Sequence, residues 1–341
     1  MMNQRKAIVA GCGARAKVWV RDAIARDGVE IVAFVDIVEE QAAKMAAEFG
    51  VPAACFTNVA EAIDATGADL VLDVTIPDSR REVVTTALRR GCDVFAEKPM
   101  ATTLEEAREL LGVARETGKA YSIMQNRRYI PRIRALRDAL AGGVIGRIGE
   151  THADFFLGPH FGGFRDAMDS PLILDMAIHT FDQARFLTGA NPVSVYCHEF
   201  NPPGSWYRGN ASAICIFEMS DGSVFSYRGS WCAEGFPTPW EGNWRIVGEK
   251  GTALWEHDTD PRCAIADPDA PGGFLREARI VDIPVGSYGR RDDEGCFDDM
   301  FDALQAGRPA DTDAADNIHS IAMVHAAIES ARRGEKVAIR V

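Results

Sequence analysis

The strongest constraint on the fold is a short glycine motif near the N-terminus. Residues 11–16 read GCGARA, directly after an apolar strand-like run and directly before a helix-like run. The spacing fits G-x-G-x-x-G/A, in which Gly11 makes the tight turn, Gly13 lets the backbone approach a pyrophosphate, and Ala16 permits close helix–strand packing. The helix N-terminus offers N–H groups and a positive dipole end to phosphates. A glycine turn can also be purely structural, so the surroundings of the motif decide its meaning.

The same alternation of strand and helix continues to about residue 125. Short runs rich in β-branched residues alternate with helix-like stretches, which is typical of βαβ units and a parallel sheet. A glycine follows each helix-like stretch, where a C-cap is expected. The predicted strands are 6–10, 29–35, 70–74, 93–96 and 120–123, and the predicted helices are 16–26, 39–49, 59–66, 81–90 and 104–116.

The pattern changes after Asn126. Successive strand-like runs are separated by turn residues such as Asp221-Gly222 and Lys250-Gly251, which is typical of a hairpin-rich antiparallel sheet. The predicted strands are 192–199, 211–219, 223–230, 243–247, 252–256 and 279–283, and the predicted helices are 131–140, 174–187, 294–306 and 313–333.

We therefore predict two closely joined domains, as the length of 341 residues also favours. Residues 1–125 form an α/β Rossmann domain with a doubly wound parallel sheet that binds a dinucleotide. Residues 126–341 form an α+β domain for substrate binding and oligomerisation, with a large, mainly antiparallel open sheet. The last helix, 313–333, is expected to pack back toward the Rossmann domain.

Composition excludes several classes of protein. The net charge of −13 argues against nucleic acid as a partner. No apolar run approaches the roughly 20 residues of a membrane helix, and the N-terminal run ends at Gly11, too early for a signal peptide. The eight cysteines are scattered, with no CxxC pair or zinc spacing, which favours a reducing cytoplasm.

Asp36 strengthens the dinucleotide interpretation. It ends the second predicted strand, 23 residues after Gly13, where a carboxylate accepts hydrogen bonds from the adenosine ribose hydroxyls. Its charge would repel a 2′-phosphate, and its neighbour is Ile37 rather than an arginine. The sequence therefore favours NAD over NADP, although Asp36 could also be an ordinary turn residue.

Glu97-Lys98-Pro99 follows the 93–96 strand at the carboxyl edge of the predicted sheet, where doubly wound folds bind ligands. A lysine there can donate to a substrate hydroxyl and stabilise a developing oxyanion. Partial burial would lower its pKa toward the working pH. The alternative is a surface lysine with Glu97 as its ion-pair partner.

Residues 175–182 read DMAIHTFD and form the second candidate catalytic group. On an α-helix Asp175 and His179 share one face, with Asp182 near it. Imidazole titrates in the range that suits a base for the hydroxyl proton, and Asp175 could orient it or bind a substrate hydroxyl. The alternatives are an ordinary helix start and a metal site, but a third metal ligand is missing, so we predict no metal.

The order GCGARA, EKP and D-x-x-x-H-x-x-D resembles the Gfo/Idh/MocA oxidoreductases, a family that includes inositol and sugar dehydrogenases. IVGEKGTALWE and FDDMFDALQAGRP extend the resemblance over nearly the whole chain. It implies a catalytic triad of Lys98, Asp175 and His179. Ala177 replaces the family's usual glycine, and Arg81 stands where many members have histidine. With the motifs above, it predicts a cofactor site of Gly11, Cys12, Gly13, Ala14, Arg15, Asp36, Thr75, Ile76, Pro77, Glu97, Lys98 and Asn126.

We expect the substrate pocket between the Rossmann edge and the open face of the large sheet, with the 157–171 loop as a cover. Polar groups beside aromatic surface suit a sugar or cyclitol. In the family a second subunit covers the other sheet face, so a homodimer or homotetramer is expected. The candidate substrate residues are Arg127, Asp154, His160, Arg165, Trp231 and Trp240.

These features favour an NAD-dependent oxidoreductase that transfers hydride between a CH–OH carbon of a sugar, cyclitol or related polyol and nicotinamide. Lys98 and His179 would handle the proton, and Asp175 would orient. One alternative is an NAD-using glycoside hydrolase that works by transient oxidation and elimination. The other is a non-catalytic NAD-binding sensor, which would have no need of all three residues.

Overall fold

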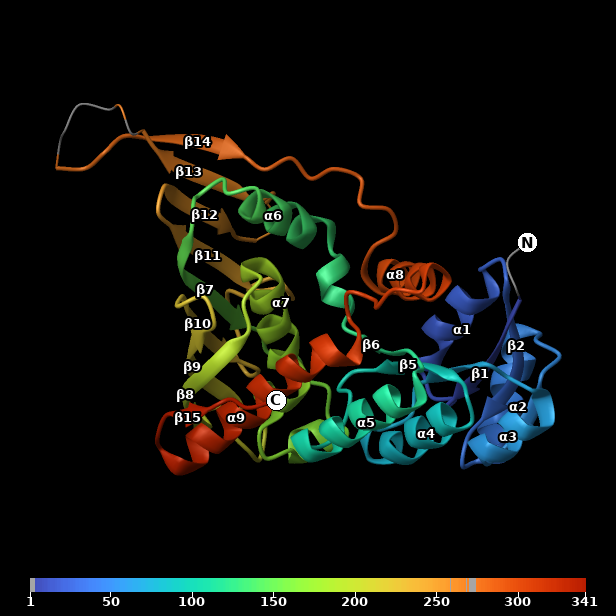
Figure 1. Ribbon diagram of the computed structural model, residues 1–341. Coiled ribbons are helices and arrows are strands. Elements are labelled where there is room, and N and C mark those ends of the chain that lie inside the picture. Colours follow the sequence, from blue (N-terminus) through green and yellow to red (C-terminus); the bar gives the residue numbers. More distant parts are fainter. Residues whose placement is uncertain (1–3, 258, 268, 270–273) are drawn as a thin grey trace. The chain divides into compact units, whose positions relative to one another are not determined.

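The structure, a computed structural model, divides into two compact units (Figure 1). It describes residues 4–257, 259–267, 269 and 274–341. The first unit contains the described residues up to Asn126 together with Asp292–Ile318. The second contains the described residues within Arg127–Arg291 and His319–Val341. The chain therefore passes from one unit to the other three times.

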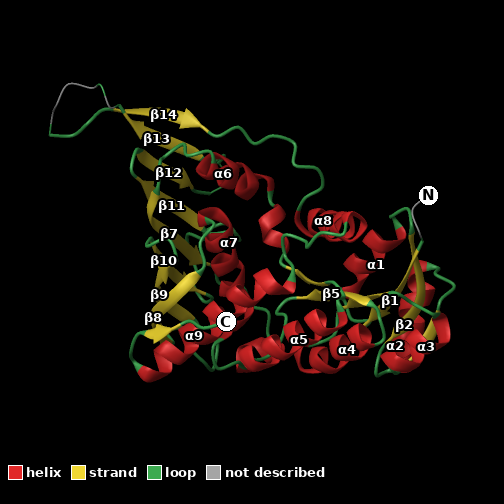
Figure 2. Ribbon diagram, viewed as in Figure 1, coloured by secondary structure: helices red, strands yellow, loops and turns green. Residues whose placement is uncertain are grey.

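The first unit is built on one six-stranded parallel sheet (Figure 2). Its strands are β1 Arg5–Ala10, β2 Val29–Val35, β3 Ala54–Phe56, β4 Leu70–Asp73, β5 Asp93–Glu97 and β6 Tyr121–Met124, and its helices are α1 Ala16–Ile24, α2 Glu39–Phe49, α3 Val59–Thr66, α4 Pro77–Arg89, α5 Leu104–Thr117 and α8 Asp292–Ala306. The strand order β3-β2-β1-β4-β5-β6 reverses direction between β1 and β4. With right-handed crossovers this order places helices on both faces, so the sheet is doubly wound.

The second unit is built on a nine-stranded mixed sheet. Its strands are β7 Ile148–Phe156, β8 Pro192–Phe200, β9 Ser212–Met219, β10 Val224–Ser230, β11 Asn243–Gly248, β12 Gly251–Trp255, β13 Arg262–Ala266, β14 Ala278–Asp282 and β15 Val337–Ala338. The order is β14-β13-β12-β11-β7-β10-β9-β8-β15, and only the β7–β10 pair is parallel among these described strands. The predicted fold class is therefore confirmed.

Helices cover one face of this mixed sheet (Figure 1). They are α6 Pro131–Ala141, the π-helix η3 Leu172–Ala177, α7 Ile178–Thr188 and the second part of α9 Ala314–Arg333. The short helices η1 Asn126–Tyr129 and η2 Gly163–Ala167 precede α6 and η3 in the chain. Phe181 of α7 is fully buried, with its ring centroid 4.9 Å from Phe217, 6.2 Å from Phe225 and 5.3 Å from Tyr227. Aromatic contacts therefore join the helix layer to β9 and β10.

The structure departs from the sequence expectations in several elements. Strands β3, β13 and β15 were not expected, and neither was β7, which lies in the middle of the large sheet between β11 and β10. The inward side chains of β7 include Thr151 and Ala153, which give a weak apolar alternation. The predicted helix 174–187 is α-helical only from Ile178, because the preceding turn is a π-helix. Among the described residues, no helix has the length and apolar character to cross a membrane.

Replacing Phe181 by alanine tests the aromatic core of the second unit. We expect Phe181→Ala to lower the free energy of unfolding by about 3–5 kcal/mol, because a buried ring is lost and a cavity remains. The control is Phe236→Ala, since Phe236 is 102% exposed and its loss should change stability by less than about 0.5 kcal/mol. Urea unfolding followed by tryptophan fluorescence measures both, and equal effects would contradict this account of the core.

Candidate active site

The glycine motif forms a tight turn between β1 and α1. Gly11 has φ +85°, and a Cβ there would lie 2.7 Å from the backbone of Val74 and Thr75. Glycine is therefore required at position 11 by the close approach of the segment after β4. At Gly13 a Cβ would meet no atom within 4 Å, so packing in the chain does not require glycine. The approach of a ligand from outside would account for it.

Asp36 is held against this turn. Its Oδ2 accepts from the Cys12 N–H at 2.8 Å, and its Oδ1 accepts from the Val38 N–H at 2.9 Å. Each carboxylate oxygen has a second lone pair, so the group can also accept from ribose hydroxyls. Burial and the Asp36 charge raise the pKa of the Cys12 thiol to about 12, so this thiol stays neutral.

Asp36 and the turn border a cavity of about 520 Å³. It is lined by Cys12, Gly13, Ala14, Lys17, Asp36, Gln41, Lys44, Met45 and Glu48. A carboxylate at the end of β2, beside a glycine turn and the start of a helix, fits the adenosine end of a dinucleotide. The predicted residues of the motif and Asp36 are thus brought together.

The ends of β4 and β5 are joined by a buried ion pair that sequence reasoning missed. Arg80 Nε lies 3.1 Å from Asp73 Oδ2. The side chains of Asp73 and Arg80 are 0% and 1% exposed. Asp73 Oδ1 also accepts from the Thr75 hydroxyl at 2.5 Å. Arg80 donates to the Thr75 carbonyl oxygen at 2.5 Å and to the Pro99 carbonyl oxygen. Thr75 and the Lys98-Pro99 segment are therefore fixed by one guanidinium.

Neighbouring positions in this loop are more accessible. Ile76 is 66% exposed, and Pro77 begins α4. Arg81 points elsewhere and pairs with Glu109 at 2.8 Å. The burial of Arg80 was not predicted, because Arg80, Arg81 and the residues beside them form a polar stretch typical of an exposed helix surface. The sequence feature that could have indicated it is the spacing of Arg80 from Asp73, a carboxylate that ends an otherwise apolar strand.

Glu97 at the end of β5 pairs with Arg15. Its Oε1 accepts from Arg15 Nε and from Trp19 Nε1, the latter at 3.0 Å. Its Oε2 accepts from the Lys98 backbone N–H at 3.1 Å. The Glu97 side chain is only 11% exposed, so the backbone that carries Lys98 is anchored to the glycine motif.

Asp293 of α8 completes this group and was not expected from the sequence. It accepts from Arg15 Nη1 at 2.7 Å and Nη2 at 2.8 Å, a bidentate pair. It also accepts from Asn126 Nδ2 at 2.7 Å. No local motif marks Asp293, since it lies 278 positions from Arg15 in an acidic helix start. Arg15, Glu97, Lys98 and Asn126 are thus brought together in the first unit.

The helix with Asp175 and His179 differs locally from the prediction. Asp175 lies in the π-helical turn, whereas His179 lies in α7. Because a π-helix aligns residues i and i+5, the α-helical i, i+4 relation does not strictly hold for this pair. His179 is 7% exposed, and Asp175 accepts from Arg165 Nε at 2.7 Å.

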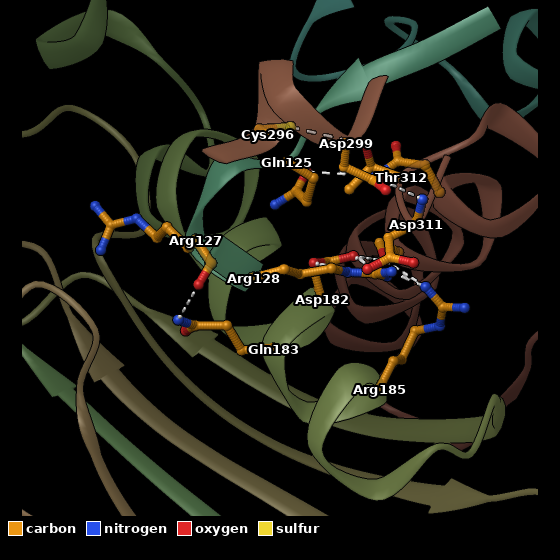
Figure 3. A network of polar contacts seen from close by, with 12 residues as sticks. Gln125, Arg127, Arg128, Asp182, Gln183, Arg185, Cys296, Asp299, Asp311 and Thr312 are labelled. Carbon is orange, nitrogen blue, oxygen red and sulfur yellow. Dashed lines mark hydrogen bonds and ion pairs between the residues drawn. The ribbon is translucent and has the colours of Figure 1, made fainter. Parts of the chain in front are cut away.

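Asp182, the last acid of that motif, has a separate role (Figure 3). Its carboxylate accepts two hydrogen bonds from Arg128, both 2.7 Å, and one from Ser320 at 2.7 Å. Arg185 donates to Ser320 at 2.8 Å. All four side chains are buried, so the network joins η1 to α7 and α9 and leaves Asp182 with a structural function.

Four of the candidate substrate residues form one row with Asp175. Arg165 lies 5.0 Å from the Phe161 ring, and the rings of Phe161 and Trp231 are 5.7 Å apart. The rings of Trp231 and Trp240 are also 5.7 Å apart, and Arg127 lies 5.9 Å from the Trp240 ring. Three aromatic rings thus lie between the polar groups, in the order Arg127, Trp240, Trp231, Phe161, Arg165 and Asp175.

The other two candidates lie elsewhere. Asp154 is on the opposite face of the sheet, because its neighbours Ala153 and Phe155 belong to the core and strand side chains alternate. It pairs there with Arg228 at 2.5 Å. His160 stacks on Trp206 with centroids 3.8 Å apart and lies 3.1 Å from Glu234.

Two family models match the chain. Residues 5–125 match the oxidoreductase family, NAD-binding Rossmann fold, of the Gfo/Idh/MocA group, and residues 133–254 match the Gfo/Idh/MocA C-terminal domain.

Individual proteins agree with these matches. A 1,5-anhydro-D-fructose reductase from Ensifer adhaerens is 34% identical over 53% of this chain and 56% of its own length. A D-apiose dehydrogenase from Paraburkholderia graminis is 26% identical over 98% of this chain and 90% of its own length. The crystal structure of an oxidoreductase from Agrobacterium radiobacter, in complex with NAD+, L-tartaric acid and magnesium, has a TM-score of 0.86 at 22% identity and covers 99% of both chains.

Proposed function

Because the chain belongs to the Gfo/Idh/MocA family of oxidoreductases, we propose that it oxidises a CH–OH group of a sugar, cyclitol or related polyol with NAD. The sugar reductase and sugar dehydrogenase among its relatives support this substrate class. The observation that carries the proposal is the anchoring of Lys98 beside the glycine motif through Glu97 and Arg15. A lysine fixed at the carboxyl edge of a dinucleotide-binding sheet is suited to act on a bound alcohol.

The dinucleotide supplies the hydride acceptor when it is bound. The glycine motif would bind its pyrophosphate, and Asp36 would accept from its ribose. Lys98 Nζ would donate a hydrogen bond to the reacting oxygen and stabilise the negative charge that develops there. His179 would accept the hydroxyl proton, and Asp175 would orient the hydroxyl or the imidazole. In the reductive direction the same groups return the proton.

Lys98→Ala tests the catalytic assignment. We expect kcat to fall by about 10²–10⁴-fold, because the group that holds the developing oxyanion is lost, while the Kd for NAD stays largely unchanged. NADH absorbance and NAD titration measure the two effects. Lys336→Ala is the control, since that side chain is 56% exposed and pairs with Glu218 on the surface. A large loss of NAD affinity would instead make Lys98 mainly a cofactor contact.

We also propose a preference for NAD over NADP, supported by the position of Asp36 at the 520 Å³ cavity. Asp36→Ala should weaken NAD about tenfold, because hydrogen bonds to a charged acceptor are lost. It should also improve NADP binding, because Lys17 and Lys44 line the same cavity and could attract a 2′-phosphate. Titration with both dinucleotides measures this, with exposed Asp64→Asn as the control. An unchanged ratio of affinities would contradict the assignment of Asp36.

A homodimer or homotetramer through the large sheet is a further part of the proposal. Four neighbouring outward residues of β8 and β9, Tyr196, Phe200, Ile214 and Ile216, are 37–48% exposed. Asp154 and Arg228 lie beside them with opposite charges. Such a face can pair with a copy of itself about a two-fold axis, which buries the apolar residues and matches each charge with its opposite.

The oligomer proposal predicts that the wild-type chain is not monomeric in solution and that Ile214→Glu with Ile216→Glu dissociates it. Light scattering after size-exclusion chromatography measures the mass. Ile280→Glu is the matched control, because Ile280 is 60% exposed but lies on β14 at the other end of the sheet. A monomeric wild type would contradict the proposal.

All eight cysteines carry free thiols, which supports a reducing location such as the cytoplasm.

A further inference from the structure

Arg165 is fixed on three sides. Its guanidinium carbon lies 5.0 Å from the ring centroid of Phe161 and 4.8 Å from that of Phe164. Its Nε donates to Asp175 Oδ2 at 2.7 Å. Because the two rings and the carboxylate restrain the side chain, little conformational entropy remains to be lost when another group binds it.

One edge of this guanidinium is left for a ligand. Within the described residues, the hydrogen bond from Nε to Asp175 is the one that the Arg165 side chain makes. The side chain is nevertheless 32% exposed. Since the rings restrain the guanidinium and Asp175 takes Nε, the accessible donors are those of Nη1 and Nη2. Two parallel N–H groups match the two oxygens of an anion such as a carboxylate.

We propose that Arg165 binds a carboxylate of the substrate, so that the substrate of the proposed dehydrogenase is a sugar acid or polyol acid. This inference rests on the proposed function, which assigns Asp175 to the same site. A carboxylate is favoured over a phosphate because Asp175 already places one negative charge at the guanidinium. A dianion would be repelled by that charge about twice as strongly as a monoanion.

The row from Arg165 to Arg127 suits the remainder of such a molecule. Trp240 is 43% exposed and offers an aromatic surface to the C–H face of a sugar ring. Phe161 and Phe164, 50% and 69% exposed, flank the bound carboxylate. Phe161 and Phe164 stand on either side of Gly162 and Gly163, which both have φ +70°, a conformation that glycine adopts without strain.

The test uses matched ligands and the whole protein saturated with NAD. Isothermal titration with D-glucuronate, D-glucose and D-glucose 6-phosphate separates a carboxylate, a neutral group and a phosphate on one sugar frame. The proteins are wild type, Arg165→Gln, Arg165→Lys and the control Arg208→Gln. Arg208 is a matched control because it also pairs with an aspartate, Asp169 at 3.0 Å, but its side chain is 69% exposed.

We expect the wild type and Arg208→Gln to bind D-glucuronate at least about tenfold more tightly than D-glucose, as a charge-assisted bidentate pair allows. Arg165→Gln should abolish this ratio, and Arg165→Lys should retain part of it. The ratio of the affinities for D-glucuronate and D-glucose cancels any general effect that the loss of Arg165 has on Asp175, because that effect would change the binding of both sugars. Equal binding of acid and neutral sugar by the wild type, an unchanged ratio in Arg165→Gln, or tighter binding of the phosphate would overturn the proposal.

NADH formation measured with the same sugars keeps this proposal separate from the proposed function. If a neutral sugar is oxidised, and D-glucuronate is bound and oxidised equally by wild type and Arg165→Gln, the dehydrogenase stands and the carboxylate site fails. If D-glucuronate binds through Arg165 and no sugar in the panel reduces NAD, the carboxylate site stands and the dehydrogenase assignment fails.

Discussion

The ion pair between Asp73 and Arg80 fixes the carboxyl edge of the parallel sheet in the first unit. Burying two charges is costly, and the cost is offset only when both are fully hydrogen-bonded. Here the two Nη atoms of the guanidinium donate to the carbonyl oxygens of Pro99 and Thr75. The desolvated charge thereby fixes the two loops that follow β4 and β5. Loss of either partner alone would leave an uncompensated buried charge, which typically destabilises a protein by about 3–5 kcal/mol.

The fold followed from the sequence wherever a strand was buried on both faces or a helix had one apolar side. The strand at Val29–Val35 was predicted to the residue, because it is apolar apart from Glu30 and lies between Gly28 and Asp36. The central strand β7 was not, because Thr151 and Ala153 fill inward positions that in other strands hold larger apolar side chains. Its place in the middle of the sheet depends on β10 and β11, which follow it by about 70 residues or more.

The candidate site was predictable where a local motif defines it. Gly11 and Asp36 lie in a spacing that βαβ geometry imposes, and the structure brings them together through Cys12. The anchors of the site were not predictable, because Arg15 meets Asp293 from the far end of the chain and Arg80 resembles its exposed neighbour Arg81. The face of the sheet on which Asp154 lies was not predictable for a related reason, since it follows from β7, which was not expected.

The return of residues 292–318 to the first unit determines when that unit can mature during synthesis. Phe297 of α8 packs edge-on against the buried Trp19, with ring centroids 4.7 Å apart, and Asp313 forms a β-bridge with Ser122 of β6. Translation proceeds from the N-terminus, and an ordinary N-terminal domain folds as soon as it leaves the ribosome. This one must wait for a segment that is made only after residues 127–291 of the second unit. Until then Trp19 and the carboxyl end of β6 lack their covering, so the nascent chain exposes apolar surface that a chaperone would recognise.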